Sequence, residues 1–114
     1  MNEGDVILTP IPQVDGQIKN RPGIILCELP PYRDLLVCGV STQIQQFVLG
    51  FDELITSKDE DFATSGLMAD SVIRLGFLAV VPRKAVAGSI GKISSDRHKR
   101  LLKTLSAYLV RNVK

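Results

Sequence analysis

The sequence predicts a mainly β protein with a C-terminal helix, folded as one domain over residues 1–114 into a small, strongly curved antiparallel sheet or barrel. Three observations predict it. Several short apolar stretches are separated by Gly, Pro and polar residues, as in chains of short strands. Helical periodicity is strong only near the C-terminus. A chain of 114 residues that is 45% hydrophobic and 23% charged suits a single core.

The first 40 residues are expected to form three strands. The expected elements are a strand at 4–9, a polar loop at 13–21, a strand at 24–29, a turn at 30–34 and a strand at 35–40. Pro10 and Pro12 are expected to break the first strand, because proline has no N–H to give to a sheet. The second and third strands should form a hairpin, since only a short turn separates them.

The rest of the chain should add three short strands and a helix. The expected elements are a strand near 47–49, an irregular or briefly helical stretch at 51–67, strands at 71–75 and 77–81, a helical turn at 82–86 and a terminal helix capped by Ser94 or Ser95. Gly76 is expected to be a kink or bulge between two strands. The carboxylates of the stretch at 52–61, which includes the acidic cluster at 59–61, are interpreted as a solvated loop rather than an acid/base pair. The apolar helix positions are Leu101, Leu102, Leu105, Tyr108 and Leu109.

Several strands are apolar at successive positions, which predicts that both faces of the sheet are covered. One helix can cover only part of the outer face. A second copy of the chain is the natural cover for the remainder, so we expect a homodimer.

The net charge of +2 hides a division along the chain. Residues 1–70 hold four Lys/Arg and eleven Asp/Glu, whereas residues 71–114 hold ten Lys/Arg and one acidic residue. The basic part could favour a polyanion or an acidic partner chain. It could equally be the solvated face of a helix.

Most familiar catalytic and cofactor sites are excluded by the residues available. Cys27 and Cys38 lie in apolar runs and are expected to be buried free thiols. One histidine, His98, cannot complete a zinc set or a Ser-His-Asp order. Residues 88–91 lack the spacing and the lysine of a phosphate-binding loop. We therefore expect neither a metal nor a cofactor.

The sequence also indicates where in the cell the protein is expected. The acidic first residues lack the basic and apolar regions of a signal peptide. No apolar run is long enough to span a membrane. We expect a cytoplasmic protein that does not associate with a membrane.

Polar residues at two strand ends are the remaining candidates for chemistry. Arg21 precedes Pro22, which favours an extended chain at Arg21 and gives its side chain a rigid base. Ser41, Thr42 and Gln43 end the neighbouring strand of the expected hairpin. Its open end should bring these residues near Arg21, whose guanidinium is suited to a phosphate.

At this point the residues resemble a known family, the PemK/MazF toxins of toxin–antitoxin systems. Its opening motif is matched by Gly4-Asp5-Val6 and then Arg21-Pro22 before an apolar strand. Its later segments are matched by residues 40–45, Asp70-Ser71-Val72-Ile73-Arg74 and residues 90–93. The similarity runs in order along nearly the whole chain. It implies an SH3-like barrel, of the kind also found in CcdB, that forms a homodimer.

The resemblance also implies an activity and its partners. Members are endoribonucleases that cleave single-stranded messenger RNA at specific sequences without a metal, leaving 2′,3′-cyclic phosphate and 5′-hydroxyl ends. A cognate antitoxin neutralises them. By the match, Arg21 stabilises the charged transition state, Ser41 binds the phosphate or relays a proton with Thr42 as its backup, and Arg74 is a second electrophile. The expected RNA contacts are Gln17, Lys19, Asn20 and Gln43.

The chain departs from the family pattern in its first loop. Many members carry an acidic residue where this chain has Gly16 beside Gln17, and Asp15, one residue away, is the candidate base. Some members have an aspartate where this chain has Gly76. Two alternatives stay open: a related toxin that poisons DNA gyrase by protein contact, and a non-catalytic barrel that binds a nucleic acid or a protein.

Overall fold

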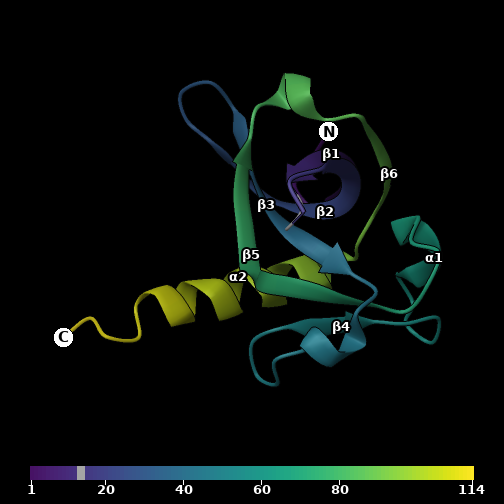
Figure 1. Ribbon diagram of the computed structural model, residues 1–114. Helices are drawn as coiled ribbons and strands as arrows, with labels where there is room; N and C mark the ends of the chain where they lie inside the picture. Colours follow the sequence, from purple (N-terminus) through teal and green to yellow (C-terminus); the bar gives the residue numbers. More distant parts are fainter. Residues whose placement is uncertain (13–14) are drawn as a thin grey trace.

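Within residues 1–12 and 15–114, which the computed structural model describes, six antiparallel strands form one curled sheet in the order β4-β5-β3-β2-β1-β6 (Figure 1). The strands are β1 (Asp5–Pro12), β2 (Ile18–Leu29), β3 (Asp34–Ser41), β4 (Glu53–Ile55), β5 (Ser71–Val81) and β6 (Gly88–Lys92). The helices are η1 (Ile44–Gln46), α1 (Phe62–Ser65), η2 (Arg83–Ala85) and α2 (Ser95–Leu109). The expected mainly β fold with a C-terminal helix is confirmed.

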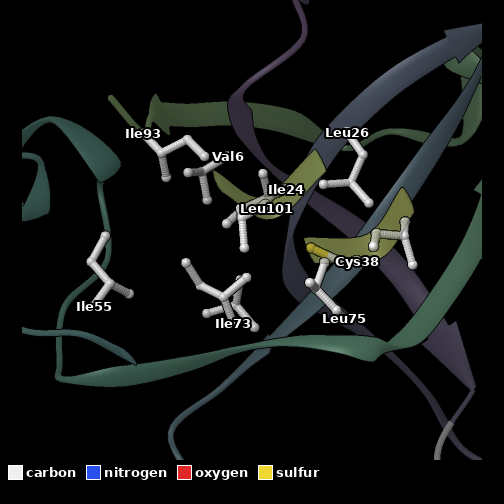
Figure 2. Close-up of a cluster of buried hydrophobic side chains, with 11 residues drawn as sticks. Val6, Ile24, Leu26, Cys38, Ile55, Ile73, Leu75, Ile93 and Leu101 are labelled. Atoms are coloured by element: carbon white, nitrogen blue, oxygen red, sulfur yellow. The ribbon is translucent and has the colours of Figure 1, made fainter. Parts of the chain in front are cut away.

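The sheet buries side chains on both faces. Alternate residues of the central strands, such as Ile24 and Cys38, point into the main core, where Leu101 of α2 packs on them (Figure 2). The residues between them point to the opposite face, where Ile25 and Val37 join a second cluster. This explains the successive apolar residues and confirms that both faces are covered. The homodimer stays a prediction.

Helix α2 begins as the sequence predicts and runs beyond the core. The Ser94 hydroxyl accepts a hydrogen bond from the Arg97 N–H at 3.1 Å and caps the helix. Leu101 and Leu105, four residues apart, are buried against the sheet. Tyr108 and Leu109 are exposed, contrary to the expected apolar face, because the last turns project past the sheet (Figure 1).

Two expectations about the β1–β2 hairpin were wrong. Strand β1 continues through Pro10 and Pro12, which pair with β2, while its other neighbour, β6, pairs only as far as Leu8. The prolines therefore lie on a free strand edge, where a missing N–H costs nothing. Residues 18–21, expected in the loop at 13–21, are the first residues of β2; residues 13–14 of that loop lie outside the described residues.

Two expectations about the second half of the chain also differ from the structure. The strand near 47–49 is absent from the described chain, because this segment turns on itself and the Val48 N–H bonds the Asp52 carboxylate at 3.0 Å. The strands expected at 71–75 and 77–81 are one strand, β5. Gly76 does lie in a bulge, since Arg74 pairs with Gly39 and Leu78 with Cys38, which leaves three β5 residues unpaired with β3.

The acidic cluster is not a solvated loop, because part of it surrounds the buried side chain of Arg97. The Arg97 Nε and Nη2 atoms donate to the two carboxylate oxygens of Asp61 at 2.8 and 3.2 Å. Its Nη1 donates to Glu53 at 2.9 Å, and Asp59 lies 3.4 Å from Nη2. A guanidinium forms such forked pairs readily, and here it joins α2 to the acidic segment. Part of the charge division is therefore neutralised inside the molecule.

The same contacts shift the ionisation of Asp61. Burial alone would raise the pKa of this carboxyl, but hydrogen bonds from Arg97 and the Ser94 N–H, together with the charge of Arg97, lower its pKa below the ordinary value. The ion pair therefore contributes stability at neutral pH.

Both cysteines are free thiols, as the sequence predicts. Cys38 is buried as expected, but Cys27 is only half-buried. Burial raises the pKa of Cys38 to about 12 and, with the nearby Glu3, also raises the pKa of Cys27. Neither thiol is activated as a nucleophile.

Among the helices that the structure describes, none has the length and apolar character to cross a membrane.

We predict that Arg97→Met lowers the free energy of unfolding by about 3 kcal/mol, because it leaves the Asp61 carboxylate buried without its charged partner. Arg100→Met is the matched control. Arg100 bonds the same Glu53 at 3.1 Å, but its side chain is 55% exposed, so the loss should stay below about 1 kcal/mol. Urea unfolding at pH 7 measures both. Equal losses in the two variants would contradict the role given to Arg97.

The lowered pKa of Asp61 predicts an acid dependence. Above the ordinary aspartate range the folded and unfolded chains are both ionised, and the contribution is complete. As the pH falls from about 4 through the lower folded-state pKa, the contribution is lost. The stability difference between the wild-type protein and Asp61→Asn, measured by urea unfolding, should therefore shrink from pH 7 to pH 3. A difference that grows in acid would contradict this sign.

Candidate functional site

A hollow of about 680 Å³ opens where β3 ends, and it is lined by most of the candidate site residues. Its walls come from β2, the end of β3, the segment after it, β5, and residues 66–69. Arg21, Ser41, Thr42, Gln43 and Arg74 all line it. We call it the Arg21 hollow.

Arg21 lies within β2 rather than before it. It is paired with Thr9 of β1, at the point where β2 passes from exposed residues to the buried run that starts at Gly23. Gly23 pairs with Gly39 of β3. Arg21 and Ser41 each lie two residues beyond this last pair, at the open end of the hairpin, and both line the hollow.

Ser41 is the last residue of β3 and half-buried. Its hydroxyl oxygen accepts a hydrogen bond from the Gln43 N–H at 3.0 Å. This local turn orients the hydroxyl and leaves its hydrogen available to an oxygen of a ligand. The Gln43 side chain is held in turn, since its oxygen accepts from the Gln45 amide at 2.8 Å. Thr42 is exposed at the rim.

Arg74 reaches the hollow from β5. It is half-buried, and its Cζ lies 5.9 Å from the ring centre of Phe77, which also lines the hollow. Within residues 1–12 and 15–114, Arg74 makes no ion pair with a carboxylate. Its charge is therefore not neutralised by a described acidic neighbour.

The other expected site residues do not line the hollow. Gln17, Lys19 and Asn20 are exposed on the outer part of the β1–β2 hairpin. Asp15 is exposed there too, where its Oδ1 accepts a hydrogen bond from the Gln17 N–H at 3.0 Å. The hollow thus contains two arginines and hydroxyl groups, but no carboxylate among its described lining residues. Such a lining favours an anionic ligand.

One wall of the hollow was missed from the sequence. Residues 66–69 follow α1, which ends at Gly66 in the left-handed conformation with φ of 75°. A side chain at Gly66 would overlap the carbonyl oxygen of Ile90, so only glycine lets this wall approach β6. Met68 in this wall is 98% exposed. The glycine was the available signal, but nothing local in the sequence shows what the segment faces.

The acidic segment anchors this wall. Asp61 immediately precedes α1 and is held by Arg97, as described above. At the other end of the wall, the Asp70 carboxylate accepts a hydrogen bond from the Ser57 N–H at 2.9 Å. The wall is thus fixed at both ends by charged side chains.

His98 lies away from the Arg21 hollow. Its Nε2 is 2.8 Å from the Leu26 carbonyl oxygen, and it lines a second, polar hollow of about 610 Å³ beside the N-terminus of α2. Across the described residues, no three His, Cys, Asp or Glu side chains group in a way that could hold a metal ion.

Comparison with known proteins gives a family and a fold. The family model for the PemK-like, MazF-like toxin of type II toxin–antitoxin systems matches residues 2–109. The search of curated proteins gave no match. The solved structure of the Mycobacterium tuberculosis toxin MazF-mt6 is similar, with a TM-score of 0.66, 18% identity, and coverage of 92% of this chain and 95% of that chain. At that identity the likeness concerns the fold. The family match spans almost the whole sequence, and the chain belongs to the PemK-like, MazF-like toxins of type II toxin–antitoxin systems.

Proposed function

We propose that this toxin is an endoribonuclease that cleaves single-stranded messenger RNA at the Arg21 hollow without a metal, and that a cognate antitoxin neutralises it. The observation that carries the proposal is that Arg21, Ser41 and Arg74, from three neighbouring strands, line one hollow in a chain of this toxin family. The products are RNA with a 2′,3′-cyclic phosphate and RNA with a 5′-hydroxyl.

In the proposed reaction the ribose 2′-oxygen attacks the adjacent phosphorus and the bond to the 5′-oxygen breaks. Negative charge accumulates on the phosphorus oxygens as the reaction passes through a five-coordinate arrangement. Arg21 supplies a planar fork of donors that stays charged at any working pH. Arg74 adds a second positive charge from β5, which lies on the other side of β3 from β2. Donors already fixed before the charge develops stabilise the transition state more than the substrate.

Ser41 has a separate role in the proposal. Its hydroxyl oxygen accepts from the Gln43 N–H, and its hydrogen can be donated to a phosphate oxygen. Thr42 at the rim offers a second hydroxyl.

Two protons must also move, one from the 2′-hydroxyl and one to the leaving 5′-oxygen. Asp15 is the candidate base that the sequence offers, but its carboxylate is outside the lining of the hollow, so it would have to move on RNA binding to take this role. The flanking nucleotides would lie along the β1–β2 hairpin and contact Gln17, Lys19 and Asn20, with Gln43 inside the hollow. The antitoxin would block access to the same surface.

We predict that the purified protein cleaves a mixed-sequence RNA in the presence of EDTA. Arg21→Ala should lower the rate by about 100-fold or more, because one fixed donor to the developing charge is lost. Arg111→Ala, at an exposed position beyond the end of α2, is the matched control and should cleave at the wild-type rate. Mass spectrometry of the fragments identifies cyclic phosphate ends.

RNA left intact by the folded wild-type protein would contradict the proposal. So would cleavage that chelator abolishes, or an Arg21→Ala variant as active as the Arg111→Ala control. Each variant is first checked by thermal unfolding, so that a loss of activity is not a loss of fold.

We also predict that Asp15→Asn lowers the cleavage rate far less than Arg21→Ala does, because the Asp15 carboxylate lies on the hairpin outside the hollow. The measurement is the single-turnover rate of both variants on one RNA oligonucleotide from pH 5 to pH 9. If the loss in Asp15→Asn equals that in Arg21→Ala and the low-pH limb of the profile disappears, Asp15 is the base and moves to the phosphate when RNA binds.

A further inference from the structure

Among the described residues, Phe77 is the aromatic residue whose ring lies at cation–π distance from the guanidinium of Arg74. The distance from the Arg74 Cζ to the ring centre is 5.9 Å. This is within the range in which the negative face of an aromatic ring attracts a cation. Both residues line the Arg21 hollow, and the Phe77 side chain is partly exposed there.

The bulge in β5 makes this contact possible. In a regular strand, residues three apart point to opposite faces of the sheet. Here Arg74 pairs with Gly39 and Leu78 pairs with Cys38, so Leu75, Gly76 and Phe77 have no partner in β3. The extra residues turn Phe77 back to the side where Arg74 lies.

Asp52 holds the bulge in place. Its Oδ1 accepts a hydrogen bond from the Leu75 N–H at 3.1 Å, and its Oδ2 accepts one from the Val48 N–H at 3.0 Å. The carboxylate is buried and replaces the partner that the Leu75 N–H lacks in β3. The bulge is therefore a fixed feature of the sheet.

Gly39 supplies the seat for the ring. A Cβ atom built at Gly39 would lie 3.1 Å from Cδ1 and 3.3 Å from Cγ of Phe77. The ring thus rests directly on the backbone of β3, opposite Arg74. Even a methyl group at residue 39 would be in tighter contact than usual and would require the ring to move by a few tenths of an ångström.

We propose that Phe77 is a positioning residue for Arg74: its ring, seated on Gly39 by the β5 bulge, holds the guanidinium in the hollow, toward the place of the scissile phosphate. This inference rests on the ribonuclease function proposed above. It assigns a role to Gly39 as well, because a side chain there would crowd the ring. The strand bulge is then part of the arrangement of the site.

The first test is a double-mutant cycle on RNA cleavage. Phe77→Leu keeps apolar bulk and removes the ring face, and it should lower the single-turnover rate by roughly threefold to tenfold. Phe77→Tyr keeps the ring and should stay within about twofold of the wild-type protein. In an Arg74→Ala background, Phe77→Leu should have no further effect, because the residue it acts through is gone. Equal losses in both backgrounds would overturn the proposal.

Two further variants separate positioning from folding. Gly39→Ala leaves Phe77 and Arg74 intact but forces the ring to move by a few tenths of an ångström, so it should lower the rate in the same direction as Phe77→Leu and by a smaller factor. Tyr32→Leu, which removes an aromatic ring 82% exposed in the β2–β3 turn, is the matched control and should leave the rate unchanged. A Gly39→Ala variant as active as the wild-type protein would count against the seat.

A measurement without RNA keeps this inference distinct from the proposed function. Protons above a ring face are shielded, so the Arg74 Hδ resonances in NMR should move upfield in the wild-type protein and in Phe77→Tyr, relative to Phe77→Leu. If RNA is not cleaved but this shift is present, the ribonuclease proposal fails and the ring contact stands. If the Arg74 resonances are the same in Phe77→Leu, the positioning role is overturned whatever the cleavage result.

Discussion

The buried ion pair between Arg97 and Asp61 is the interaction on which the arrangement of this protein most depends. It joins the start of α2 to the acidic segment that leads into α1, and the hydrogen bond from the Ser94 N–H places the helix cap in the same contact. Such a pair contributes only because its geometry is nearly complete, since each charge loses water on burial. Its consequence for function is indirect: the segment it anchors becomes the Gly66–Ala69 wall of the Arg21 hollow.

A second carboxylate performs a similar task inside the sheet. Asp52 ties the loop after η1 to the unpaired backbone of β5, beside Arg74. Two aspartates of the acidic half thus fix the geometry around arginines of the basic half. The opposite charges of the two halves are explained in part by these internal contacts. The exposed cations of α2 are not used by these internal contacts and could meet an anionic ligand or an acidic partner.

The class of fold was easier to predict from the sequence than the course of individual segments. Apolar runs on successive residues predicted a sheet covered on both faces, and the Ser94 cap was readable from local pattern. Local pattern failed wherever the outcome depends on distant residues. Strand β1 continues to Pro12 because β6 does not pair with its other edge there. The segment around Val48 forms no strand, because the Val48 N–H is bonded to the Asp52 carboxylate. The role of Asp61 was missed for the same reason, since its partner lies 36 residues away.

For the candidate site too, local pattern was informative and contacts between distant residues were missed. The hairpin register could place Arg21 near Ser41, and the family resemblance pointed to Arg74. Neither could indicate Phe77 or the wall at residues 66–69, which reach the hollow through a bulge and a distant ion pair. The central claim is that Arg21 and Arg74 act together on one phosphate. NMR titration with an RNA oligonucleotide that has a 2′-deoxy sugar at the scissile position, and so no nucleophile, tests it most directly. The account predicts that the Nε–Hε signals of Arg21 and Arg74 shift together with a single dissociation constant; a shift in only one of them would contradict it.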